Sequence, residues 1–120
     1  MSEGSAYGAS SDHENRRQYA RTKINVPVEL QTEESESPIR GATTDLSVGG
    51  CYIETIFPFP VGTALDLQLQ IPDNTVPVSA TVVTCDPQVG NGIRFEKMLP
   101  EDREALEAYL KTLGEENKSP

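Results

Sequence analysis

The chain has 120 residues, and ten Lys and Arg against nineteen Asp and Glu give it a formal net charge of −9. This length predicts one domain of about 100 residues with a single modest core. The acidic balance disfavours DNA or RNA bound along a phosphate track, because that requires a broad basic face. The sequence has neither an apolar run of roughly 18 residues nor a secretory signal, so we expect a cytoplasmic protein without membrane insertion.

Residues 1–14 are rich in Ser and Gly and are predicted to form a flexible tail, which contains the only histidine, His13. From Ile24 to Leu30 apolar and polar residues alternate, which predicts a first strand. Pro27 within it indicates an edge or a bulge. The acidic, Ser-rich residues 31–38 are typical of a solvated hairpin loop.

Five further short strands are expected, at residues 39–44, 51–55, 65–71, 76–85 and 93–95. Residues 72–74 and 86–92 are turn-rich links between the last three. Residues 57–62 contain too many prolines for regular structure. We expect Phe57 and Phe59 to plug one end of the core, with an exposed aromatic partner site as the alternative.

A helix is predicted after the last strand, because Pro100 suits a first helical position and Gly114 suits an exit. Its apolar stripe, expected to pack on the strands, consists of Leu106, Tyr109, Leu110 and Leu113. Residues 114–120 are expected to be frayed. The predicted fold class is therefore mainly β, a six-stranded antiparallel β-barrel with a C-terminal α-helix.

The sequence offers little catalytic chemistry. His13 lies in the predicted tail, so no Ser-His-Asp or Cys–His set is expected in the folded region, and no metal site or cofactor is expected either. Cys51 and Cys85 both lie in apolar, strand-like segments, which favours buried thiols over a disulfide. We therefore expect a protein that is not an enzyme.

Residues 44–53 place polar groups in a turn with apolar residues on both sides. In an extended segment, Asp45 and Ser47 point to the same face. Gly49 and Gly50 permit a positive φ or a close approach to the backbone. An ionised Asp accepts two adjacent N–H donors, such as those of guanine. On this stretch alone, the favoured alternative is a turn in which Asp45 and Ser47 cap their own backbone.

Four of the ten cations fall within residues 16–23, with no acid among them. They are Arg16, Arg17, Arg21 and Lys23. Such a small basic patch suits a small anion. Arginine is the preferred residue for this task, because its planar fork binds phosphate or the O6/N7 edge of guanine and its face stacks on a base.

Together, Arg17-x-x-x-Arg21 and Asp45-x-Ser47-x-x-Gly50 resemble the two-part motif of the PilZ domain, a bacterial receptor for cyclic di-GMP. The resemblance implies that Arg17 and Arg21 grip the phosphates and the guanine edges. It also implies that Asp45 and Ser47 hold a guanine while Gly50 leaves space for it.

The resemblance covers residues 15–113. In this family an arginine at the position of Arg16 is associated with a stacked ligand dimer, so two cyclic di-GMP molecules per chain are expected. The implied function is a receptor whose segment 12–22 becomes ordered over the ligand and signals to a downstream protein, in motility, exopolysaccharide and biofilm formation or related regulation. The alternative is a PilZ-like protein adaptor that binds no nucleotide. A barrel for single-stranded nucleic acid ranks lower, because aromatic residues make up 6% of the chain and the cations form one cluster.

Overall fold

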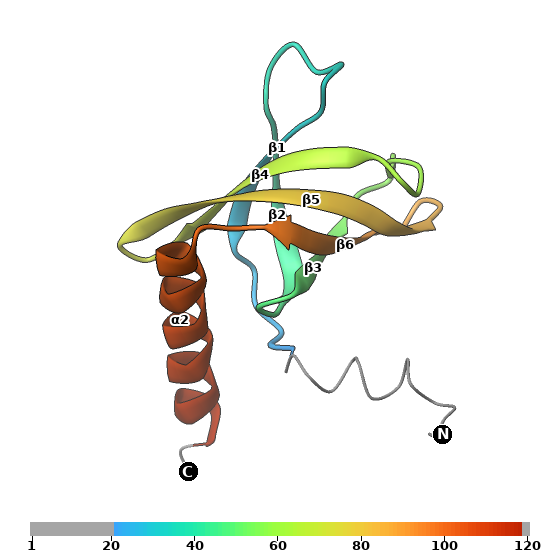
Figure 1. Ribbon diagram of the computed structural model, residues 1–120. Helices are drawn as coiled ribbons and strands as arrows, with labels where there is room; N and C mark the ends of the chain where they lie inside the picture. The colour runs from blue at the N-terminus through green and yellow to red at the C-terminus, as the bar shows by residue number, and fades with distance from the viewer. Residues whose placement is uncertain (1–20, 119–120) are drawn as a thin grey trace, which may run out of the picture.

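The computed structural model describes residues 21–118, so Arg16, Arg17 and the predicted tail at residues 1–14 lie outside the described residues. Figure 1 shows a barrel of strands from which the helix near the C-terminus extends. The elements are β1 (Pro27–Gln31), β2 (Ile39–Leu46), β3 (Gly50–Glu54), β4 (Ala64–Ile71), β5 (Asn74–Asp86), β6 (Gly90–Lys97) and α2 (Pro100–Lys118). The strands close in the order β1-β2-β3-β6-β5-β4, and every neighbouring pair is antiparallel. The predicted fold class is confirmed.

The core fills the barrel because alternate side chains of each strand point inward. In β4 the inward side chains Leu65, Leu67 and Leu69 are buried, whereas the intervening polar residues face outward. Leu106 of α2 is fully buried against this core, as the helical stripe predicts. No helix among residues 21–118 is long and apolar enough to cross a membrane.

Several predicted boundaries were wrong. Strand β1 begins at Pro27 and not at Ile24, and it pairs with both β2 and β4, so Pro27 does not mark an edge strand. Strand β2 continues through Asp45 and Leu46, because these two residues pair with Tyr52 and Cys51 of β3. Strand β6 already begins at Gly90, within the segment expected to be a turn. Helix α2 continues past Gly114 to Lys118, since an internal glycine costs a helix only about 1 kcal/mol.

The expected aromatic plug is half correct. Phe59 packs against the core, but the Phe57 side chain is 82% exposed. The loop between β3 and β4 therefore presents one phenylalanine to the core and the other to solvent.

Candidate functional site

The chain enters the barrel beside the end of β2, and a buried threonine holds it there. Thr43, fully buried, donates its hydroxyl to the Ile24 carbonyl at 2.6 Å and accepts from the Val26 N–H at 3.0 Å. Further upstream, the N–H of Thr22 donates to the carbonyl of Leu46 at 2.9 Å, and the N–H of Leu46 donates back at 2.9 Å. This pairing aligns the residues before β1 with the second half of β2.

As a consequence, two motif residues that are 24 positions apart in the sequence meet. Arg21 donates from Nη1 to Oδ1 of Asp45 at 2.8 Å. The Arg21 side chain is 52% exposed and that of Asp45 is 27% exposed, so both remain accessible to a ligand. The Asp45 carboxylate faces Arg21 and not the backbone of its own turn.

Ser47 has a different place in the structure. It is only 3% exposed, and its hydroxyl accepts hydrogen bonds from the N–H groups of Gly49 and Gly50, each at 3.1 Å. The same hydroxyl lies 3.2 Å from the Gly50 carbonyl, to which it donates. Ser47 thus caps its own backbone, as the turn alternative predicts, and a ligand contact for Ser47 stays a prediction.

Gly50 lies where β3 and β6 approach closely. A Cβ at this position would run into the carbonyl oxygen of Ile93, so the missing side chain makes room for the backbone of β6. On the other side of the turn, the N–H of Phe95 donates to the carbonyl of Gly49 at 2.9 Å. The turn is therefore tied to the sheet, and space for a ligand at Gly50 stays a prediction.

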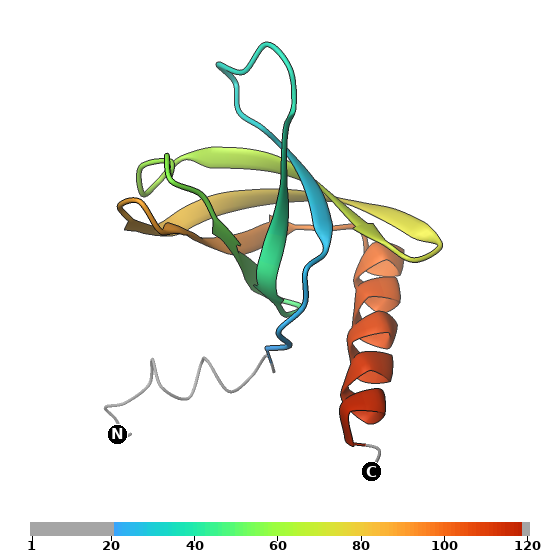
Figure 2. The ribbon, with the colours of Figure 1, turned by 180° about the vertical axis from the view of Figure 1, so that it is seen from behind.

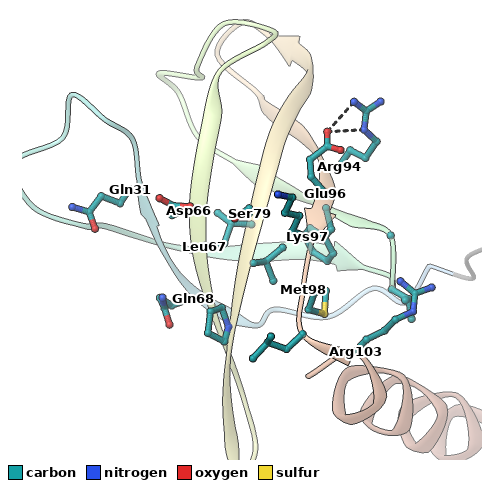
Figure 3. Close-up of a pocket in the computed structure, with 16 residues that line it drawn as sticks. Gln31, Asp66, Leu67, Gln68, Ser79, Arg94, Glu96, Lys97, Met98 and Arg103 are labelled. Carbon is teal, nitrogen blue, oxygen red and sulfur yellow. Dashed lines mark hydrogen bonds and ion pairs between the residues drawn. The ribbon is translucent and has the colours of Figure 1, made fainter. Parts of the chain in front are cut away.

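Figure 3 shows a cavity beside this turn that sequence reasoning missed. Its volume is about 950 Å³, and it extends from Gly49 across β6, β5 and β4 to the start of α2. Arg94, Lys97 and Arg103 are the cations among its lining residues. Arg94 forms an ion pair with Glu96 at 2.9 Å and holds the pKa of that carboxyl below its usual value. Only the tertiary fold brings these residues together, so no motif or spacing indicated the cavity.

The first residues of β3 lie close to the Arg21–Asp45 pair. Burial raises the pKa of the Cys51 thiol to about 12, and the negative charge of Asp45 adds to this effect. Next to it, the Tyr52 hydroxyl donates to Oδ2 of Asp86 at 2.7 Å, which raises the pKa of Tyr52 to about 12 because the bond favours the neutral phenol. Cys51 is buried as predicted, Cys85 is half-buried, and both are free thiols.

Within residues 21–118, no group of three or more His, Cys, Asp or Glu side chains is arranged to hold a metal ion. Arg16 and Arg17, the first cations of the predicted site, lie outside the described residues. The structure therefore brings Arg21, Asp45 and the Ser47–Gly50 turn together.

Comparison with solved structures shows the same fold in several proteins. The motility inhibitor MotI/DgrA of Bacillus subtilis has 24% sequence identity and a TM-score of 0.75, over 87% of this chain and 54% of that one. YcgR of Escherichia coli, solved in complex with c-di-GMP, has 17% identity and a TM-score of 0.72, over 86% and 48%. The chain thus spans about half the length of these two proteins. The PilZ domain of CeSA from a cellulose-synthesizing bacterium has 16% identity and a TM-score of 0.62, over 79% and 98%.

A comparison with curated proteins finds no match. The sequence profile of the PilZ domain, however, matches residues 15–112, which is most of the chain and includes both halves of the motif. The chain therefore belongs to the PilZ domain family.

Proposed function

We propose that this chain is a cyclic di-GMP receptor that binds its ligand without chemical conversion. The observation that carries the proposal is the 2.8 Å contact between Arg21 and Asp45, which unites the two halves of the motif on one accessible surface. The PilZ profile match and the fold shared with YcgR, solved with c-di-GMP, support the same ligand.

The chemistry of the pair suits a guanine nucleotide. The Asp45 carboxylate accepts two parallel N–H bonds from the guanine edge, and Arg21, released from it, turns its guanidinium to phosphate or to the O6/N7 edge. Ser47 keeps the turn in place so that Asp45 has a fixed position. Charge-assisted hydrogen bonds contribute on the order of 1.5–3 kcal/mol each, so several of them offset the cost of ordering a short segment.

The segment before the barrel completes the proposed site. Arg17 lies four residues before Arg21 in the motif and supplies a second guanidinium. Arg16 adds a cation and a flat face for a second ligand. We propose that this segment becomes ordered across the Asp45–Gly50 face when two ligands bind. The resulting surface signals to a downstream protein, with motility as the favoured output because MotI is a structural relative.

Isothermal titration of cyclic di-GMP into the purified full chain tests the proposal, with GTP as the control ligand. We expect saturable binding near two ligands per chain, which Arg17→Ala or Asp45→Ala abolishes. Lys23→Ala is the matched control, because Lys23 lies in the same basic stretch but at no motif position, and it should bind like the wild type. Absence of heat at tens of micromolar would overturn the receptor function and favour the protein adaptor.

The stoichiometry is tested separately. If Arg16 supports a second ligand, Arg16→Ala should lower the ratio from two to one per chain and leave a saturable first site. One ligand per chain in both the wild type and Arg16→Ala would contradict the ligand dimer without affecting the receptor function.

A further inference from the structure

The end of β3 that lies away from the Ser47–Gly50 turn carries exposed apolar side chains. Ile56 is 65% exposed, Phe57 82% and Val89 53%. The N–H of Thr55 donates to the carbonyl of Val89 at 3.0 Å, so the loop after β3 and the turn between β5 and β6 are neighbours. Figures 1 and 2 show both loops at the same end of the barrel. We call Ile56, Phe57 and Val89 the apolar patch.

The loop that carries the patch is held in place by one buried side chain. Asn91, 2% exposed, accepts from the Phe59 N–H at 2.9 Å and donates to the Phe59 carbonyl at 2.9 Å and to the Thr84 carbonyl at 3.1 Å. The Phe57 N–H also donates to the Thr55 hydroxyl at 3.1 Å. Phe57 therefore stands on a backbone that is fixed on both sides, and such an anchor binds at low ordering cost.

The surroundings of the patch are acidic. Glu54 and Asp86 flank it on β3 and β5, and both are exposed. Glu33 and Glu34 of the loop between β1 and β2 line a cavity of about 410 Å³ together with Pro60 of the patch loop.

The segments that build this end, 32–37, 54–63 and 84–91, contain no Lys or Arg. The patch therefore has a rim of a single sign. An exposed apolar cluster with a polar rim marks a protein interaction site, and a rim of one charge selects a partner with the opposite charge.

We propose that the apolar patch binds a protein partner whose contact surface is apolar and rimmed by Lys and Arg. A symmetric contact between the patches of two copies of this chain does not fit, because two acidic rims would face each other. The patch lies apart from the Arg21–Asp45 pair: Asp45 pairs with Tyr52, and the four residue steps from Tyr52 to Ile56 span roughly 13 Å along the strand. The partner therefore binds without using the ligand-binding residues.

Photo-crosslinking from position 57 tests this proposal in cells that naturally carry the protein. Phe57 is replaced by p-benzoylphenylalanine in the full chain, and Val83, an exposed apolar residue of β5 that is 38% exposed, is replaced in the control. We expect one protein product from position 57 alone, and sequencing should place the crosslink in an apolar segment with neighbouring Lys or Arg. The same product should form when Asp45→Ala is also present, so the outcome is independent of the proposed ligand function.

The partner that crosslinking identifies is then purified, and titration of this chain with it completes the test. Phe57→Ser should weaken its binding about tenfold or more, as truncation of an aromatic anchor does, whereas Val83→Ser should leave it unchanged. Added salt should weaken the binding, because the acidic rim is exposed to screening. The proposal is overturned if position 57 gives no product or if both positions give the same product. It is also overturned if the crosslinked partner is a lipid, a second copy of this chain or a protein whose contact surface is acidic.

Discussion

The two ends of β3 are built in the same way. At its start, Ser47 is 3% exposed and its hydroxyl holds the N–H groups of Gly49 and Gly50. At its other end, Asn91 is 2% exposed and its amide holds both backbone groups of Phe59. In each case one buried polar side chain replaces hydrogen bonds that the loop lacks, which fixes the loop without regular structure.

The two ends differ in what they expose. The first end carries the Arg21–Asp45 ion pair, which suits a small charged ligand, whereas the second exposes Phe57 with acids around it. Loop rigidity therefore says little about the partner. The buried residue determines the shape of the loop, and the exposed residues determine what the loop recognises.

The largest expected effect is at the close approach of β3 and β6. Gly50→Ala should destabilise the protein by about 2–3 kcal/mol, because the new Cβ meets the Ile93 carbonyl, and a backbone atom cannot rotate away. Gly41→Ala is the control, since the nearest atoms, from Leu30 and Ile53, would lie at 3.6 and 3.7 Å. Urea unfolding followed by circular dichroism measures both. A loss of stability in Gly50→Ala as small as that in Gly41→Ala would mean that β6 moves aside at little cost.

A substitution at the other end of β3 should destabilise the protein somewhat less. Asn91→Ala leaves the N–H and carbonyl of Phe59 without their partner, which should cost about 2 kcal/mol. Amide hydrogen exchange at Phe59 should accelerate at the same time. Asn74→Ala, at the exposed first residue of β5, is the control and should change neither property. If exchange at Phe59 stayed slow in Asn91→Ala, the loop would not depend on this side chain.

Sequence patterns predicted the first end far better than the second, for physical reasons. Strand β4 was predictable because its inward residues alternate with polar ones. Arg21 and Asp45 were predictable as site residues because their types and spacing match a known motif. Asn91, in contrast, lies in Gly-Asn-Gly, a composition typical of a turn, and the glycines are needed for close approach. A Cβ on Gly92 would collide with the Thr84 hydroxyl.

Other features depend on contacts that no local pattern encodes. β2 continues through Asp45 and Leu46 because both residues pair with β3, and Leu46 also exchanges hydrogen bonds with Thr22, more than twenty residues upstream. Ser47 was predicted as a ligand contact or as a turn cap, and only the buried position of its hydroxyl shows the capping role. The cavity at Gly49 requires three strands and the start of α2 to meet, so it follows from the closed barrel alone.

A smaller effect should distinguish the two cysteines, one at each end of the barrel. The pKa of Cys51 is about 12 in the folded state against 9.0 for a free thiol. Below pH 9 both states keep the proton, but above it the unfolded state loses the proton first, so stability falls as pH rises. Between pH 8 and 9.5 this loss is on the order of 1 kcal/mol.

Unfolding measurements at these two pH values test whether the Cys51 thiol causes this pH dependence of stability. The wild type and Cys85→Ala should both lose this stability, and Cys51→Ala should not. The raised pKa of Tyr52 is due mainly to its hydrogen bond with Asp86, which all three proteins keep, so this contribution largely cancels in the comparison. A loss of the same size in Cys51→Ala would show that other groups cause the pH dependence.

The smallest expected effect on stability is at the residues most important for the proposed ligand. The Arg21–Asp45 pair is 52% and 27% exposed, and such pairs contribute only about 0.2–1 kcal/mol. Arg21→Ala should therefore lower the free energy of unfolding by less than about 1 kcal/mol while it abolishes cyclic di-GMP binding. A double-mutant cycle with Asp45→Ala measures the coupling between the two side chains. A stability loss above about 2 kcal/mol would contradict the prediction that Arg21 serves binding and not stability. The lost binding would then reflect a damaged barrel and not a missing ligand contact.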